Sequence, residues 1–376
     1  MEPPASHTKP DRKPPPTLED LGKILGLSKR AVSQALHDRT GTVKVSAATR
    51  ERVRALAKTL GYRKNMAAAA LTTRRTGMFG ILTSVGRMHV SAMQLAAAVD
   101  EFRSLGISPL VIHDAARSAA EYDFSLDTLI NSRVDGVLLL HRPPHFGEAH
   151  VEKLRDYGMS IVQIGSTSPA HNISHYLTDR RQAFGLVVDH VLSQGYRRLG
   201  TITRNQDQYP HPTWQASGIQ THVAILEAVN QARNAGADIS LEIYNAAGRG
   251  EEYPDVHLLY APGYAVTRDL IAKGSLPEVL ICQVDGWALG AMRACGEAGI
   301  RIPEDMAITG YGNEPSGSAT LVPLTSITEP FEEMCRAAIT ELVSAVKEGR
   351  ATHRQPVVMP CELIVRRSSL RSGAEL

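Results

Sequence analysis

Residues 17–38 read TLEDLGKILGLSKRAVSQALHD, and this stretch decides the fold at the start of the chain. Thr17 is a good helix N-cap, and Asp20, three residues later, can complete a capping box. Gly26 is typical of a residue that ends a helix, and Ser28 can cap a second helix soon after it. The residues that recur at helical spacing in the first helix are Leu18, Leu21 and Leu25. Two short helices joined by a tight turn that contains glycine predict a helix-turn-helix.

The second predicted helix gathers its polar residues on one side. Helical spacing places on a single face Lys29, Arg30, Ser33, Gln34 and His37. Val32 and Leu36 point the other way, toward a core. Contact with water is the usual role of such a face; the sharper hypothesis is that this row of side chains reads the edges of DNA bases.

A third helix is predicted within VSAATRERVRALAKTLGY, residues 45–62, with Ser46 as its N-cap. Its inner stripe consists of Val53, Leu56, Ala57 and Leu60. The three helices can enclose a small core, with the predicted members Leu21, Leu25, Leu27, Val32, Leu36, Val45, Val53, Leu56 and Leu60.

Charge is distributed unevenly along the chain. The net charge of all 376 residues is only +2, but residues 1–76 hold 16 Lys and Arg against 6 Asp and Glu. Residues 77–376 hold 25 against 33. A basic head on an acidic body indicates that the head contacts a polyanion, although basic segments can also serve solubility. Because these charges lie in a segment with its own apolar periodicity, they favour a folded basic module.

The segment YRKNMAAAALTTRRTG, residues 62–77, follows the third helix. Its plain interpretation is an interdomain linker with some helical tendency, because so short a helix is marginal in water. The functional interpretation is a hinge that becomes helical on DNA. Its small Ala side chains would allow close approach to a minor groove, and Leu71 would wedge between base steps.

From residue 78 the pattern changes to short apolar runs that alternate with amphipathic helices. The predicted strands are MFGILTS, LVIHD, DGVLLLH, SIVQIG, LGTIT, VLICQ and DMAITGY. The predicted helices are AMQLAAAVDEFRSLG, AFGLVVDHVLSQG, HVAILEAVNQARNAG and LGAMRACGEAG. Such alternation predicts doubly wound parallel sheets, and about 300 residues favour two lobes with a ligand-binding cleft between their carboxyl strand ends.

Several classes of protein are disfavoured. The four cysteines form no CxxC pair, which argues against a disulfide framework and a zinc site and suits a cytoplasmic protein. The Pro-rich residues 1–16 resemble a disordered tail and no signal peptide, and no apolar run is long enough to span a membrane. A metal site at His141, His145 and His150 is poor because prolines interrupt the stretch. No nucleophile elbow or phosphate loop is present, so we expect neither an enzyme nor a cofactor.

These stretches together resemble the LacI/GalR (lactose/galactose repressor) family of bacterial transcriptional regulators. The resemblance rests on residues 17–38, on 45–65 and on the hinge that ends at Leu71. It continues through LTDRRQAFGLVVDHVLSQGYRRLGTI, VDGWALGAMRACGEAGIRIPEDMAITGYGN, VPLTSITEP and CELIVRRSS. It implies an N-terminal all-α helix-turn-helix domain followed by an α/β periplasmic-binding-protein-like domain.

The resemblance implies DNA contacts by specific residues. Base reading falls on Lys29, Arg30 and Gln34, with Arg30 suited to guanine and Gln34 to adenine. The full predicted set is Thr17, Ser28, Lys29, Arg30, Ser33, Gln34, His37, Lys44, Asn65, Ala68 and Leu71. Departures from the family at Ala31, Gln34 and Lys64 affect the base sequence that would be read more than binding itself.

The effector pocket departs further from the family. Positions that hold Arg, Asn and Asp in sugar-responsive members are Gln215, Val284 and Gly312 in this chain. Asp285 is retained, but we expect it to cap the following helix. The candidate effector residues are Ser84, His141, Gln215, Tyr264, Asp285, Trp287, Asn313 and Phe331, although each aromatic residue is more often plain core.

The domain layout implied is a tail (1–16), a helix-turn-helix domain (17–62), a hinge helix (63–76) and an effector-binding and dimerisation domain (77–376). Its N-lobe comprises 77–177 and 328–357, and its C-lobe 178–327 and 358–370. The expected function is that of a homodimeric repressor of a pseudo-palindromic operator, with a sugar, a nucleoside or another metabolite as the candidate effector. The alternative is a cytoplasmic small-molecule-binding protein with no role on DNA.

Overall fold

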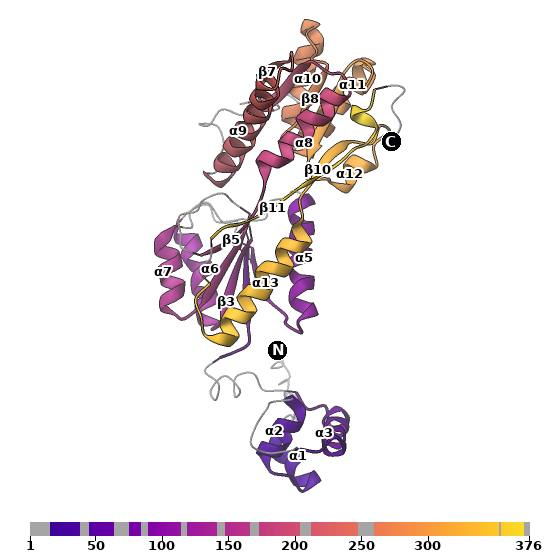
Figure 1. The fold of residues 1–376 in the computed structure, drawn as a ribbon. Coiled ribbons are helices and arrows are strands. Elements are labelled where there is room, and N and C mark those ends of the chain that lie inside the picture. Colours follow the sequence, from indigo (N-terminus) through magenta and orange to yellow (C-terminus); the bar gives the residue numbers. More distant parts are fainter. Residues whose placement is uncertain are drawn as a thin grey trace, which may run out of the picture. The chain divides into compact units, whose positions relative to one another are not determined.

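The computed structural model describes residues 16–37, 45–63, 75–83, 89–113, 119–140, 147–165, 173–203, 212–246, 259–352 and 355–371. The chain divides into two compact units, residues 1–76 and 77–376, and each is described by itself (Figure 1). Most of the predicted tail and of the predicted hinge, including Leu71, lies outside the described residues.

Within its described residues, the first unit contains three helices that begin and end where the capping signals predict. They are α1 (Leu18–Leu25), α2 (Lys29–His37) and α3 (Ala47–Thr59). Thr17 and Asp20 form the predicted capping box, and Gly26 ends α1 in the left-handed conformation with φ of 68°. The Ser28 hydroxyl accepts from the Ala31 amide at 3.2 Å, and the Ser46 hydroxyl accepts from Thr49 at 3.2 Å. The capping predictions are therefore confirmed.

The core of this unit is small. Its fully or nearly fully buried members are Leu21, Val32, Ala35, Val53 and Ala57, and most of the other predicted core residues pack partly buried around them. The prediction was wrong for Leu60, which is 38% exposed. Leu60 is the C-cap residue of α3, so its side chain extends past the last helical turn that covers the core.

The second unit contains two six-stranded sheets, one in each lobe (Figure 1). The first, in the order β11-β5-β4-β3-β1-β2, is parallel throughout. Its strands are β1 (Phe79–Thr83), β2 (Leu110–His113), β3 (Gly136–Leu140), β4 (Ser160–Ile164), β5 (Ser174–Thr178) and β11 (Val357–Met359). The second, in the order β12-β10-β9-β8-β6-β7, is parallel except for β12. Its strands are β6 (Arg198–Thr203), β7 (Ser240–Asn245), β8 (Val279–Ile281), β9 (Ala307–Tyr311), β10 (Thr325–Thr328) and β12 (Glu362–Ile364).

Helices cover both faces of each sheet. In the first lobe α5 (His89–Ser104) and α13 (Phe331–Glu348) pack on one face, and α6 (Ala119–Asn131) and α7 (Glu148–Asp156) on the other. In the second lobe α8 (Arg180–Ser193) and α9 (Pro212–Asn234) pack on one face, and α10 (Ala261–Lys273) and α11 (Asp285–Ala298) on the other. The short helices α12 (Pro315–Ser318) and η2 (Arg367–Ser369) complete this lobe. The predicted fold class, two doubly wound lobes after a helical head, is confirmed.

All the predicted strands and helices are present in the second unit, but several others were not predicted. Among the unpredicted strands, β5, β7 and β10 carry polar residues such as His175, Glu242 and Ser326, which dilute the apolar signal, and β11 is only three residues long. The prediction for α9 began ten residues too late, because Pro212 and the polar residues after it are weak helix signals.

The chain passes between the two lobes at three places. It crosses from β5 to α8 at Asp179, from β10 to α13 at 329–330, and from β11 to β12 at 360–361. The Asp179 amide donates to the Met359 carbonyl at 2.8 Å, which joins two of these crossings. No helix among the described residues is long and apolar enough to cross a membrane.

Candidate nucleic-acid interface and effector site

The N-terminus of α2 presents its polar residues to solvent. Ser28, Lys29 and Arg30 are all exposed, and the first turn of α2 contains no acidic residue. The Ser28 hydroxyl accepts from the Ala31 amide, and the positive end of the helix dipole at this first turn favours anions. Two cations beside a helix N-terminus are chemically suited to phosphate oxygens and to guanine edges.

Fewer residues of the predicted polar face of α2 are exposed than the helical spacing indicated. Gln34 was predicted to be exposed, but only 9% of it is accessible. It lies three residues from Ala31, which packs in the core at 8% exposure, so it shares the edge of the buried face. Ser33 is half-buried, and the side chain of His37 lies outside the described residues. Base reading by Gln34 remains a prediction, and it would require this side chain to emerge from the surface.

The other predicted DNA contacts are not tested by the structure. The Thr17 hydroxyl is engaged with Asp20 at the start of α1. The positions outside the described residues are Lys44, Asn65, Ala68 and Leu71.

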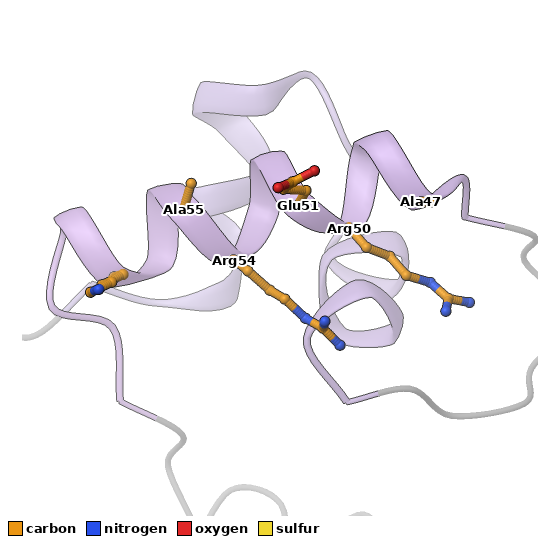
Figure 2. Close-up of a pocket in the computed structure, with 6 residues that line it drawn as sticks. Ala47, Arg50, Glu51, Arg54 and Ala55 are labelled. Atoms are coloured by element: carbon orange, nitrogen blue, oxygen red, sulfur yellow. The ribbon is translucent and has the colours of Figure 1, made fainter.

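A basic groove on α3 was not predicted. This open groove of about 720 Å³ is lined by Ala47, Arg50, Glu51, Arg54, Ala55 and Lys58. Arg50 and Arg54 extend from α3 to the same side (Figure 2). Their spacing with Lys58, at i, i+4 and i+8, is the sequence signal that could have revealed the groove.

In the second lobe, Asp285 is the buried anchor of the loops at the carboxyl edge of the sheet. Its carboxylate accepts from the Ser326 hydroxyl and from the Glu314 amide, both at 2.6 Å, and the residue is 0% exposed. The predicted N-cap role is wrong, because the N-cap is Val284 and Asp285 is the first residue of α11. Burial raises the pKa of Asp285 to about 6, although the two hydrogen bonds oppose this shift.

Asn313 joins the same network. Its backbone amide donates to the Ser326 hydroxyl at 3.0 Å, and its side-chain oxygen accepts from Arg366 at 2.7 Å. Its φ of 48° is in the left-handed region, which Asn tolerates better than most residues. The structure therefore brings Asp285 and Asn313 into one network. The side-chain oxygen of Asn313 is already occupied by its hydrogen bond with Arg366 in the C-terminal segment.

The remaining effector candidates do not form one site among the described residues. Tyr264 lies between α10 and α11, and its hydroxyl donates to Glu297 at 2.5 Å, near the end of α11 remote from the strand edge. Trp287 is a core residue at 8% exposure, and Phe331 packs partly buried on the first lobe's core. Ser84, His141 and the side chain of Gln215 lie outside the described residues.

A hydrogen-bonded cluster at the lobe crossings was also missed. Thr178 and Tyr311 both donate to the same Glu329 carboxylate oxygen, at 3.0 and 2.8 Å. Arg180 lies 5.4 Å from the centre of the Tyr311 ring. Burial, with the nearby Glu329 carboxylate, raises the pKa of Tyr311 well above its usual value, so the phenol stays a neutral donor. This cluster joins the ends of β5, β9 and β10 where the lobes meet.

Comparison with known proteins agrees with this architecture. A family model described as a periplasmic binding protein-like domain matches residues 188–369. The HTH-type transcriptional regulator CelR of Thermobifida fusca is 27% identical over 368 residues, which cover 95% of this chain and 99% of that protein. The lactose operon repressor of Escherichia coli is 23% identical, over 96% of this chain and 92% of that protein.

Solved structures give the same result for the fold. The lac repressor dimer bound to operator and an anti-inducer has a TM-score of 0.72 at 21% identity and covers 95% of this chain and 100% of that chain. A complex of CelR with cellobiose has a TM-score of 0.62 at 24% identity, over 94% of this chain and 99% of that chain. With three capped helices in the head, two doubly wound lobes and relatives that match along about 95% of its length, the chain is similar throughout to HTH-type transcriptional regulators and has the fold of the lac repressor.

Proposed function

We propose that this protein is a homodimeric repressor that binds a pseudo-palindromic DNA operator through its heads and a small-molecule effector through its body. The observation that carries the proposal is that regulators align with the chain across both the head and the body, over about 95% of its length. The exposed cations at the N-terminus of α2 support it, because this is the end of a recognition helix that contacts bases.

DNA binding is tested by selection of sites from random duplex DNA, followed by anisotropy titrations at several salt concentrations. Arg30→Ala should cost ~1–3 kcal/mol of discrimination at one base position, since a bidentate contact to guanine is lost. Arg52→Ala is the matched control, because Arg52 is an exposed arginine of the same head on α3. Failure of the full chain to enrich any site, or equal effects of the two variants, would contradict the proposal.

We further propose that the dimer forms through α5 and β2. The edge strand β2 leaves Val111 39% exposed, and α5 leaves Met93 48% exposed with Ala92 and Ala96 also accessible. A second copy is the occupant this face fits, because a two-fold pair of such edges would bury both apolar rows. A lac repressor structure that is similar in fold, with a TM-score of 0.72, is itself described as a dimer.

The proposed effector would act by changing how the lobes are held together. Hydrogen bonds of Thr178, Tyr311 and Glu329 cross the junction between the lobes, so a ligand that favours one lobe arrangement would compete with them. CelR is described in complex with cellobiose, and a neutral sugar is a reasonable first compound to examine.

A further inference from the structure

We propose that Gln283 reads the effector of this protein by donating a hydrogen bond from its side-chain amide to an oxygen of a neutral ligand. This inference rests on the proposed effector function. It assigns the polar contact to a residue outside the positions that hold Arg, Asn and Asp in sugar-responsive family members.

Gln283 lies where β8 passes into α11, at the carboxyl edge of the second sheet. The strand ends at Ile281, the Cys282 amide still donates to the Thr309 carbonyl at 2.9 Å, and α11 begins at Asp285. Val279 and Ile281 pack on the side of α8 and α9, whereas Leu280 and Cys282 pack on the side of α10 and α11. Gln283 and Val284 form the bend that connects this strand end to α11.

The amide of Gln283 is buried without a partner. The residue is 5% exposed, and its Nε2 atom has no hydrogen-bond partner among the residues that the structure describes. Gln163 at the carboxyl end of β4 provides the contrast. It is 0% exposed, its Nε2 donates to the Gly165 carbonyl at 3.0 Å, and its Oε1 lies 3.2 Å from His175 Nε2. A buried donor left unsatisfied destabilises the free protein, and a bound acceptor would remove that cost.

Polar groups at the same edge of the sheet are engaged with one another. Asp285 holds Ser326 and the Glu314 amide, and the Asn313 side chain accepts from Arg366. Val284, which replaces the family's Asn, packs against the apolar cluster under α11 and has no polar group to offer. Gln283 therefore supplies a buried, unsatisfied donor, which neither Asp285 nor Val284 has.

Charge at this edge favours a neutral ligand. The carboxylates of Asp285 and Glu314 are buried there, and that of Glu329 is close to the lobe junction. Arg180 is engaged by Thr221 and the Tyr311 ring, and Arg366 by Asn313 and the Leu324 carbonyl. An anion brought beside buried carboxylates would be repelled, whereas a hydroxyl or carbonyl oxygen would not.

The first experiment needs no ligand. Full-length Gln283→Met and Gln163→Met are unfolded in urea and followed by tryptophan fluorescence, since both tryptophans, Trp214 and Trp287, lie in the body. We expect Gln283→Met to unfold at an equal or higher urea midpoint than wild type, because it removes an unsatisfied donor. Gln163→Met should unfold at a clearly lower midpoint, because it removes two hydrogen bonds. A fall in midpoint for Gln283→Met as large as that for Gln163→Met would overturn the assignment.

The second experiment measures thermal stabilisation by cellobiose, maltose, ribose and adenosine, each beside an anionic counterpart: cellobionate, maltobionate, ribose 5-phosphate and AMP. We expect a neutral compound to raise the unfolding temperature of wild type and of Gln163→Met by several degrees, and to lose this effect in Gln283→Met. A response only to an anion, an undiminished response of Gln283→Met, or no response of wild type would each overturn the inference. Operator binding measured on the same samples separates this failure from that of the proposed function, since the DNA contacts lie in the head.

Discussion

In the second lobe, a single buried residue can connect several secondary-structure elements through its hydrogen bonds. Asp285 is inaccessible, yet it joins α11, the loop after β9 and the start of β10 through Ser326 and Glu314. A Cβ atom at Gly310 would lie 2.0 Å from the Asp285 carboxylate oxygen, so the strand beneath it has room for glycine only. Burial disfavours the charged form of this carboxylate and raises its pKa to about 6.

This raised pKa makes a prediction for stability against pH. Between the unfolded pKa of 3.8 and about 6, folded Asp285 keeps a proton that the unfolded chain has lost, so its contribution to stability falls as pH rises. Asp285→Asn cannot titrate. The difference in unfolding free energy between Asp285→Asn and wild type should therefore change in favour of the variant as pH rises through this window, by up to ~3 kcal/mol at pH 7 compared with its value below pH 3.8.

The matched control for this prediction is Asp305→Asn. Arg301 lowers the pKa of Asp305 to about 2, so this carboxylate stabilises the fold above its unfolded pKa of 3.8 and loses that effect as pH falls toward 2. The two variants should therefore shift the pH dependence of urea unfolding in opposite directions. Parallel profiles would show that Asp285 is not titrating in the folded protein between pH 4 and 6.

At the scale of elements, the packing of α10 on α11 depends on two glycines. A Cβ atom at Gly263 would lie 1.9 Å from the Trp287 carbonyl oxygen, and one at Gly290 would lie 2.0 Å from that of Tyr260. These neighbours are backbone atoms, which cannot move aside as a flexible side chain can. The two helices therefore cross at backbone contact, and their residues Tyr264 and Glu297 meet over the crossing.

Gly290→Ala should accordingly destabilise the body, by ~1–3 kcal/mol or more, because the added methyl group forces the helices apart. Gly296→Ala is the control on the same helix, since nothing lies within 4 Å of its Cβ position. It should stabilise by ~0.5–1 kcal/mol, because alanine restricts the unfolded chain more than glycine. Urea denaturation of both variants distinguishes the two effects, and a change of the same sign in both would contradict the crossing geometry.

At the scale of the whole molecule, the body is two similar lobes joined by three chain crossings. Hydrogen bonds at these crossings link Asp179 to Met359, Gln182 to Cys361, and Thr178 to Glu329. Because residues distant in sequence meet there, a change in the lobe arrangement involves all three crossings at once. This is the physical basis on which an effector between the lobes could alter the body as a unit.

The proposed dimer belongs to the same scale. Met93→Glu should convert the dimer to monomer in sedimentation velocity, because a carboxylate would be buried at the interface of α5 with its copy. It should also reduce operator affinity strongly, since the two half-sites would no longer be bound by one particle. Phe124→Glu is the control: Phe124 is 74% exposed and lies on α6, on the opposite face of the sheet from α5. A dimer of undiminished stability in Met93→Glu would place the interface elsewhere.

The sequence by itself determined the helical head, its caps and the alternation of strands and helices in the body. These are local properties: Thr17, Ser28 and Ser46 cap the backbone within three residues, and buried strands such as GVLLL are apolar along their length. Local signals failed where they were weak, as in the polar strands β5, β7 and β10 and at the start of α9.

Only the tertiary structure decided what the polar residues do. Asp285 has the sequence context of a helix cap, but in the structure its carboxylate binds Ser326 of β10 and the Glu314 amide, which are 41 and 29 residues away in sequence. Gln34 follows helical spacing with exposed residues, yet it lies at the edge of the buried face of α2 and is only 9% exposed. Gln283 carries no signal at all in the sequence, because a missing partner is a property of everything folded around it.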